Sequence, residues 1–196
     1  MSENNAANEE KTFVKEKKSL DPRIALAIMI VMICCALCIG ANKAWKKNRV
    51  SVDAAYIAWE DNIQQRVETA YNLLTVAGRY LPATDAQVAS VRNDLKTMES
   101  ADAADRVSAG ETFLTDAQSL LASLAANQAV QGDSRDTMYV TLMLPQAVEQ
   151  CSNNAAMTAY NAAAQSYNDG LRSFSGLLAR LTGIDYAPTL TVGAAE

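Results

Sequence analysis

Histidine is missing from the 196 residues, and glycine and proline are scarce, with eight and four copies. Without histidine there is no Ser-His-Asp triad, no Cys-His pair and no His-ligated zinc or haem. No two glycines are two residues apart, and none precedes a Gly-Lys pair at the P-loop spacing, so both common phosphate-binding loops are absent. We therefore expect neither an enzyme nor a cofactor or metal.

Basic residues are few in the main part of the chain. Residues 51–196 carry 8 basic and 17 acidic side chains, which argues against nucleic acid as a partner. The exception is a short basic cluster just before this region, formed by Lys43, Lys46, Lys47 and Arg49. Its position beside an apolar run predicts contact with lipid headgroups.

That apolar run extends from Ile24 to Ala41 without a charge, and at about 1.5 Å per residue it is long enough for a bilayer core. The alternative is a secretory signal peptide, whose apolar region is usually shorter and ends at a small-residue cleavage site. Trp45 and the basic cluster instead favour a retained transmembrane helix over 24–41, preceded by a disordered polar tail over 1–23. The run contains three of the four cysteines, for which packing and acylation are both open: Cys34, Cys35 and Cys38.

No glycine lies between Gly40 and Gly78, so the membrane helix is predicted to continue without a break to Tyr80. An apolar seam with strict 4-3 spacing supports this, formed by Val52, Tyr56, Trp59, Ile63, Arg66, Ala70, Leu73, Ala77 and Tyr80. Thr84, with Gln87 three residues later, is the expected cap of the next helix.

Residues 85–131 have weaker helical patterns, and a break is expected within about 100–110. Pro145 should start or kink the last helical segment. A second 4-3 seam follows it, formed by Tyr160, Ala164, Tyr167, Leu171, Phe174, Leu178 and Leu181. The prediction is an all-α protein in which the transmembrane helix continues into an antiparallel up-and-down four-helix bundle over 42–186, with a C-terminal tail over 187–196.

Two Tyr-Asn pairs lie seven residues apart, at Tyr160-Asn161 and Tyr167-Asn168. Phe174 and an apolar segment that contains Gly183 follow them. Together with Asn72 in the first helix and the anchor, they resemble the LemA family. The resemblance implies a single-pass bacterial membrane protein with a four-helix domain of undefined molecular role. The chain departs from the family pattern where a Glu and an Arg are usual, because it carries Gln150 and Met157.

The paired tyrosines and asparagines lie on one helix face, since seven residues are close to two turns. Two interpretations of these side chains are open: they pack between helices, or they form a ligand or partner site. Packing is favoured. Arg66 in the first seam needs a partner or a route to the surface, because an unpaired buried charge is costly. Glu149 is the expected partner.

These features predict a membrane-anchored, non-enzymatic scaffold or adaptor in the bacterial inner membrane. A sensory or ligand-binding helical domain is the alternative. The expected partners are the lipid bilayer and other membrane or envelope proteins, and a homo-oligomer is left open. The side of the membrane on which the bundle lies is undecided, because basic residues flank the apolar run on both sides.

Overall fold

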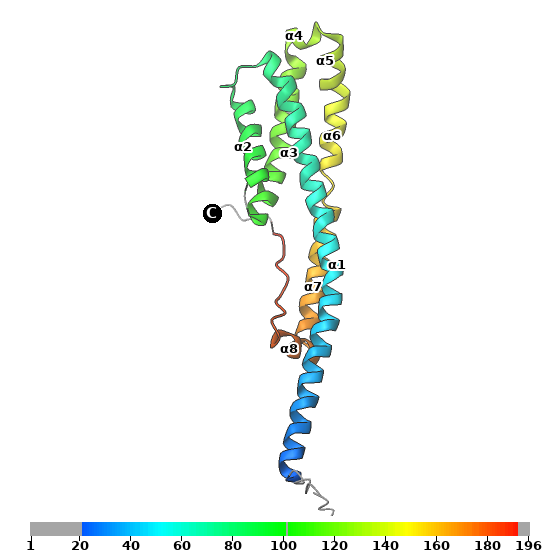
Figure 1. Ribbon diagram of the computed structural model, residues 1–196. Coiled ribbons are helices and arrows are strands. Elements are labelled where there is room, and N and C mark those ends of the chain that lie inside the picture. The colour runs from blue at the N-terminus through cyan, green and yellow to red at the C-terminus, as the bar shows by residue number, and fades with distance from the viewer. Residues whose placement is uncertain (1–20, 101, 192–196) are drawn as a thin grey trace, which may run out of the picture. The chain divides into compact units, whose positions relative to one another are not determined.

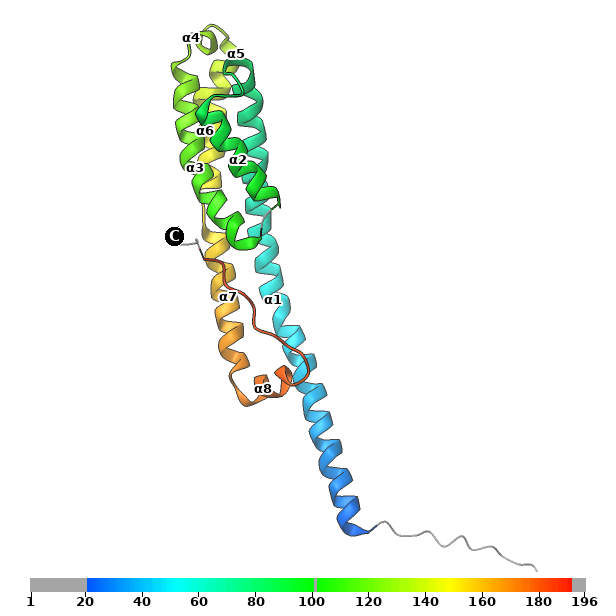
Figure 2. The same cartoon turned by 90° about the vertical axis from the view of Figure 1, so that its left-hand side faces the viewer.

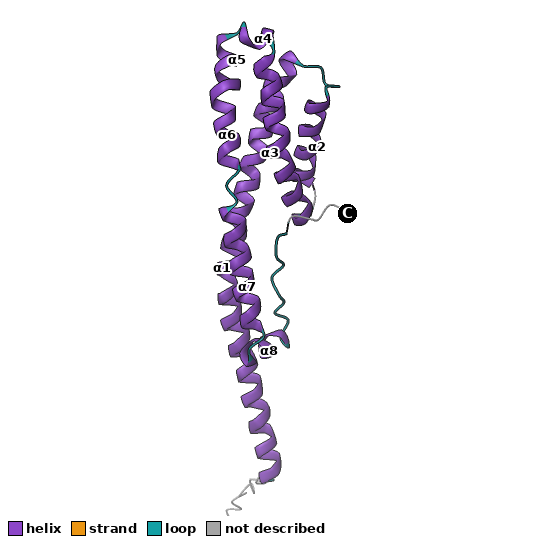
Figure 3. Cartoon of the chain, turned by 180° about the vertical axis from the view of Figure 1, so that it is seen from behind, coloured by secondary structure: helices purple, strands orange, loops and turns teal. Residues whose placement is uncertain are grey.

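The computed structural model describes residues 21–100 and 102–191, and every regular element within them is helical (Figure 3). The all-α prediction is therefore confirmed. The chain divides into two compact units, with the boundary between Leu37 and Cys38. The polar tail expected over 1–23 lies almost wholly outside the described residues.

Helix α1 (Pro22–Tyr80) begins two residues before the predicted transmembrane helix, and Asp21 Oδ1 accepts a hydrogen bond from Arg23 N at 2.9 Å at its start. Proline is tolerated there because the first turn of a helix needs no N–H donor within the helix. In the first unit the apolar side chains are exposed, and by length and composition this segment of α1 is able to cross a membrane.

The second unit begins within α1, which carries no break before Tyr80. The predicted seam faces the interior: Trp59, Ile63, Leu73 and other members are buried, and Tyr56 and Tyr80 are half-buried. Helix α2 (Ala86–Ser100) is capped by Asp85, whose Oδ1 accepts from Gln87 N and Val88 N at 2.9 and 3.2 Å. The expected cap at Thr84 was thus one residue too early.

Helix α3 (Ala103–Ala126) follows within a few residues, so the break falls inside the predicted window. The next segment consists of four short elements: α4 (Gln128–Gln131), α5 (Ser134–Met138), the π-helix η1 (Tyr139–Met143) and α6 (Leu144–Cys151). Pro145 lies in the first turn of α6, and the wider π turn immediately precedes it. The expected start or kink at this proline is therefore observed.

The last predicted helix is divided. Helix α7 (Ala155–Leu171) is followed by a turn, by the short α8 (Phe174–Arg180), by a second turn over 181–183 and by an extended segment over 184–191. Ser173 caps α8, and its Oγ accepts from Gly176 N at 3.3 Å. Phe174 and Leu181 are 74% and 80% exposed, so the prediction that they extend the buried seam was wrong.

Within the second unit, α1 has different neighbours along its length (Figures 1 and 2). Towards Tyr80 it lies beside α3 and the α5–η1–α6 run, and α2 packs on α3. Nearer Cys38 it lies beside α7, α8 and the extended segment. Ring contacts link the two long helices in this second part, since Tyr56 meets Tyr160 with centroids 5.5 Å apart and Trp45 meets Tyr167 at 5.6 Å.

Candidate functional site

The paired Tyr-Asn residues of α7 hold the extended segment. Asn168 Nδ2 donates to Ala187 O and Asn168 Oδ1 accepts from Ala187 N, both at 2.8 Å. One heptad earlier, Asn161 does the same with Leu190 O and N at 2.7 and 2.8 Å. Tyr160 adds a third anchor by donating to Pro188 O at 2.6 Å. We call these three side chains the α7 clamp.

The clamp works because the extended backbone has donors and acceptors without partners in a helix or sheet, and a primary amide supplies one of each. The side chains of the clamped residues Ala187 and Leu190 are buried, as is that of Ile184, which lies nearer to α8 in the sequence. Ala187 and Leu190 therefore belong to the core, although they lie in the segment that was predicted as a C-terminal tail over 187–196. The asparagines bond to an extended segment rather than to a neighbouring helix.

Tyr167 has a different role from Tyr160. Its ring is buried edge-on against Trp45, and its hydroxyl is buried with no hydrogen-bond partner among the described residues. Trp45 is only 8% exposed and covers Gly170 so closely that a Cβ there would overlap its ring. Trp45 was expected at the membrane interface, and the structure instead places its side chain in the protein interior.

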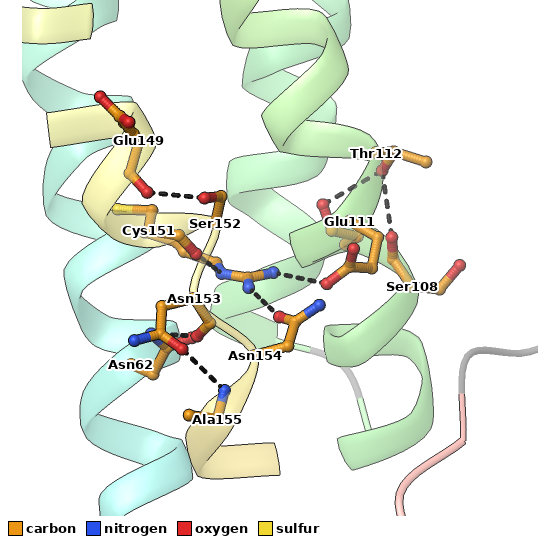
Figure 4. A network of polar contacts seen from close by, with 12 residues as sticks. Asn62, Ser108, Glu111, Thr112, Glu149, Cys151, Ser152, Asn153, Asn154 and Ala155 are labelled. Carbon is orange, nitrogen blue, oxygen red and sulfur yellow. Dashed lines mark hydrogen bonds and ion pairs between the residues drawn. The ribbon is translucent and has the colours of Figure 1, made fainter. Parts of the chain in front are cut away.

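Arg66 joins groups on both sides of the break between α6 and α7 and is the centre of a second polar cluster. Figure 4 shows its partners Glu111, Cys151 and Asn154 around this break. The Arg66 guanidinium is buried and donates to Cys151 O at 3.1 Å, Glu111 Oε1 at 3.1 Å and Asn154 Oδ1 at 2.7 Å. The predicted partner was Glu149, which is wrong: its backbone carbonyl bonds Ser152, while Glu111 of α3 pairs with Arg66.

This cluster supplies hydrogen-bond partners where the last helix is interrupted. Residues 152–154 leave the helix, so backbone groups near the break need partners from outside it. Arg66 supplies donors to one carbonyl and one side chain, and Asn153 Oδ1 accepts from Ala155 N at 2.9 Å. Burial raises the pKa of the neighbouring Cys151 thiol, which packs against Thr69. A neutral thiol in this position is a packing group rather than a nucleophile.

Asn72 lies elsewhere, on the wall of a cavity of about 370 Å³ beside the π-helix. Arg79, Arg135 and Tyr139 line the same cavity. At its edge the buried Asp136 accepts hydrogen bonds from Tyr80 Oη at 2.8 Å and Arg79 Nη1 at 2.8–2.9 Å. These bonds hold the pKa of Asp136 below its ordinary value.

The predicted basic cluster remains available to solvent or lipid. Lys43, Lys46 and Lys47 are exposed, while Arg49 is half-buried and pairs with Asp53 at 3.5 Å. Among residues 21–100 and 102–191, no group of three or more Cys, Asp or Glu side chains is arranged to hold a metal ion. The sequence prediction thus located the clamp and Arg66, whereas it missed the segment that the clamp holds.

No family model matches the chain, and no curated protein or solved structure proved similar to it.

Proposed function

We propose that this protein is a membrane-anchored, non-enzymatic scaffold or adaptor, a divergent member of the LemA family in the bacterial inner membrane. In this proposal the apolar part of α1 crosses the bilayer once. The helices of the second unit form an antiparallel up-and-down bundle whose surface receives other envelope proteins.

The exposed apolar surface of α1 supports the anchor. Large apolar side chains from Ile24 to Ile39 are about half exposed or more, and such a continuous surface is unfavourable in water. Lysines follow the run directly, as is typical of the headgroup layer.

The use of the interior polar groups is the observation that carries the scaffold proposal. Arg66 is committed to three protein partners, and Asn161 and Asn168 each use both ends of the amide on backbone groups. Groups engaged in this way stabilise a fixed arrangement of helices and are poorly placed to bind or transform a substrate. The remaining surface of the second unit is then the part that meets partners.

A two-part experiment tests the proposal. First, the intact mass of the protein isolated from membranes is measured, because a retained anchor keeps residues 24–41 and a signal sequence loses them. Resistance to alkaline extraction should be lost in an Ile30→Arg/Ile33→Arg variant. Second, the tagged full chain is cross-linked in cells and purified, with that variant as the control. Recovery of no protein specific to the wild type across several growth conditions would contradict the scaffold role.

A ligand-binding domain is the second candidate, and the cavity beside η1 is the observation that favours it. Arg135 and Tyr139 line it together with apolar side chains, while Arg79 on the same wall pairs with Asp136. Arg135 is therefore the group that suits a small organic anion. Short π-helices also occur often at functional sites. A panel of small carboxylates should raise the melting temperature of the full chain in detergent and lose that effect in Arg135→Ala. A panel without any shift would count against this candidate.

A further inference from the structure

Helix α8 is packed in an unusual way. Its small residues Gly176 and Ala179 face the protein and are buried, and a Cβ on Gly176 would overlap the backbone of Leu171. Leu178 is half-buried, whereas three other large apolar residues face outwards: Phe174 is 74% exposed, Leu177 49% and Leu181, the residue after the helix, 80%. A helix at a water-exposed surface normally has the opposite arrangement.

The three exposed side chains share one face of α8. Positions i, i+3 and i+7 lie within roughly 60° of one another at 100° per residue. Single exposed apolar residues need no explanation, but three large ones on one face of a short helix and its C-cap form an unpaired apolar surface. We call Phe174, Leu177 and Leu181 the α8 apolar face.

The position of α8 within the second unit indicates what covers this face. Thr182, immediately after the face, accepts hydrogen bonds from Asn42 Nδ2 at its hydroxyl and its carbonyl, at 2.7 and 3.3 Å. Asn42 is the first residue after the apolar run. Both views show α8 beside this part of α1 (Figures 1 and 2). The α8 apolar face therefore starts where the predicted bilayer-spanning residues end.

Charged and aromatic side chains around α8 fit the same environment. Lys43, Lys46 and Thr182 line one surface hollow, so two lysines lie beside the end of α8. Arg180 lies over the Tyr186 ring at 4.7 Å and bonds its hydroxyl at 3.1 Å. Arg172 precedes the helix, and Asp169 pairs with it at 3.1 Å. Basic and tyrosine side chains flanking an apolar face are characteristic of helices lying in the membrane interface.

From these observations we infer that the α8 apolar face inserts into the interfacial layer of an anionic lipid bilayer, as a second membrane contact beside the transmembrane helix. This inference rests on the proposed membrane anchor. The two contacts would come from segments far apart in sequence, and the Asn42–Thr182 bonds would hold them together. The lipid contact then orients the second unit, which a single spanning helix leaves free to rotate about its axis.

Site-directed spin labelling of the full chain tests the inference in vesicles of equal parts phosphatidylcholine and phosphatidylglycerol. The background carries Cys34→Ala, Cys35→Ala and Cys38→Ala, and keeps Cys151 because its thiol is buried. Labels are placed singly at Leu177 and Leu181, and collision with oxygen is compared with collision with a water-soluble nickel chelate. Oxygen should be favoured severalfold at both positions.

Two control labels separate the possible failures. Leu142 is an exposed leucine in η1, far along the chain from the anchor, and should favour the nickel chelate. Val31 reports on the anchor itself and should favour oxygen. If Val31 favours oxygen while Leu177 and Leu181 match Leu142, the α8 inference is wrong and the anchor stands. If Val31 also favours nickel, the proposed anchor is wrong. Labels on α8 shielded from both reagents would indicate a protein partner or a second copy, and would also overturn the inference.

A variant gives an independent measurement. Phe174→Ser/Leu177→Ser/Leu181→Ser removes only exposed apolar surface, so its helix content in detergent should match the wild type. In the same vesicles, trypsin cleavage after Arg180 should become severalfold faster, because the helix is no longer held in the lipid. Leu142→Ser is the matched control. Unchanged cleavage in the triple variant would contradict the lipid contact.

Discussion

Asn168 and Ala187 form a closed pair of hydrogen bonds, in which one side-chain amide satisfies both backbone groups of one residue at 2.8 Å. Asn168→Ala should therefore lower the free energy of unfolding by about 2 kcal/mol, since each bond contributes roughly 1 kcal/mol. Denaturation of the full chain in detergent measures this. Asn72→Ala changes the same residue type on an exposed helical surface and should alter stability by less than about 0.5 kcal/mol. Equal effects would show that the clamp contributes nothing specific.

The two tyrosines of the repeat should respond differently to loss of the hydroxyl. Tyr160→Phe removes the bond to Pro188 O and should cost about 1 kcal/mol. Tyr167→Phe removes a buried hydroxyl without a partner among the described residues, so stability should stay the same or rise slightly. Thermal unfolding of both variants measures the difference. A larger loss in Tyr167→Phe would mean that its hydroxyl has a partner in solution. Tyr167→Ala should cost about 3 kcal/mol through loss of the packed ring.

Gly170 should not tolerate a methyl group. The ring of Trp45 occupies the space of a Cβ at this position, so Gly170→Ala should destabilise the fold by about 2 kcal/mol through overpacking. Gly78→Ala is the control, because its Cβ would meet no atom within 4 Å and helix propensity alone should add about 0.5–1 kcal/mol. The free energy of unfolding should therefore fall in Gly170→Ala and rise in Gly78→Ala, as denaturation of the two variants would measure. Stabilisation by Gly170→Ala would place Trp45 outside the interior.

Arg66 should not be replaceable by lysine. Lys keeps the charge, but its single ammonium cannot reach Cys151 O, Glu111 and Asn154 in the fork geometry of a guanidinium. Arg66→Lys should cost about 2–3 kcal/mol, since buried acceptors lose their donors. Arg92→Lys, at an exposed arginine, should cost less than about 0.5 kcal/mol. Denaturant titrations that give equal midpoints for the two variants would contradict the network.

The sequence was sufficient to predict a helix and its buried face where one periodic pattern spans a long segment. The first seam predicted α1 and its buried face, because 4-3 spacing over eight steps leaves little choice of structure. The same spacing misled at Phe174 and Leu181, since the chain turns at residues 172–173 and Ser173 caps a new helix before the seam ends. Ser173, a residue type favoured at helix N-caps, was the available signal for a new helix start there.

The contacts of the candidate site were harder to predict, because they depend on which segments meet. Asn161 and Asn168 were identified by their spacing. A side-chain amide, however, forms hydrogen bonds with a helix or with an extended segment equally well. Glu149 was a reasonable partner for Arg66 on charge alone. Glu111 replaces it because α3 brings that carboxylate to the break, while the Glu149 carbonyl bonds Ser152. Likewise, nothing in the sequence near Trp45 indicated that Gly170 would leave room for its ring.

Asp94 should make stability depend on pH. It is buried between α2 and α3, and burial, with the charge of Asp116 nearby, raises its pKa to about 6 although the hydrogen bond from Thr112 opposes this. A carboxyl with a raised folded-state pKa keeps its proton when the unfolded chain has lost it. The folded state therefore binds more protons between about pH 4 and 6, and its stability falls as pH rises through that range.

Asp94→Asn isolates this effect, because an amide still accepts from Thr112 but does not ionise. Above about pH 7 the variant should be more stable than the wild type, by roughly 2–3 kcal/mol more than at pH 4. Asp105→Asn removes one exposed negative charge from α3 and should leave the difference from the wild type nearly constant with pH. Denaturation of the three proteins in detergent from pH 4 to 8 gives the curves. If Asp94→Asn parallels the wild type throughout, Asp94 ionises normally and lies nearer to water than the structure places it.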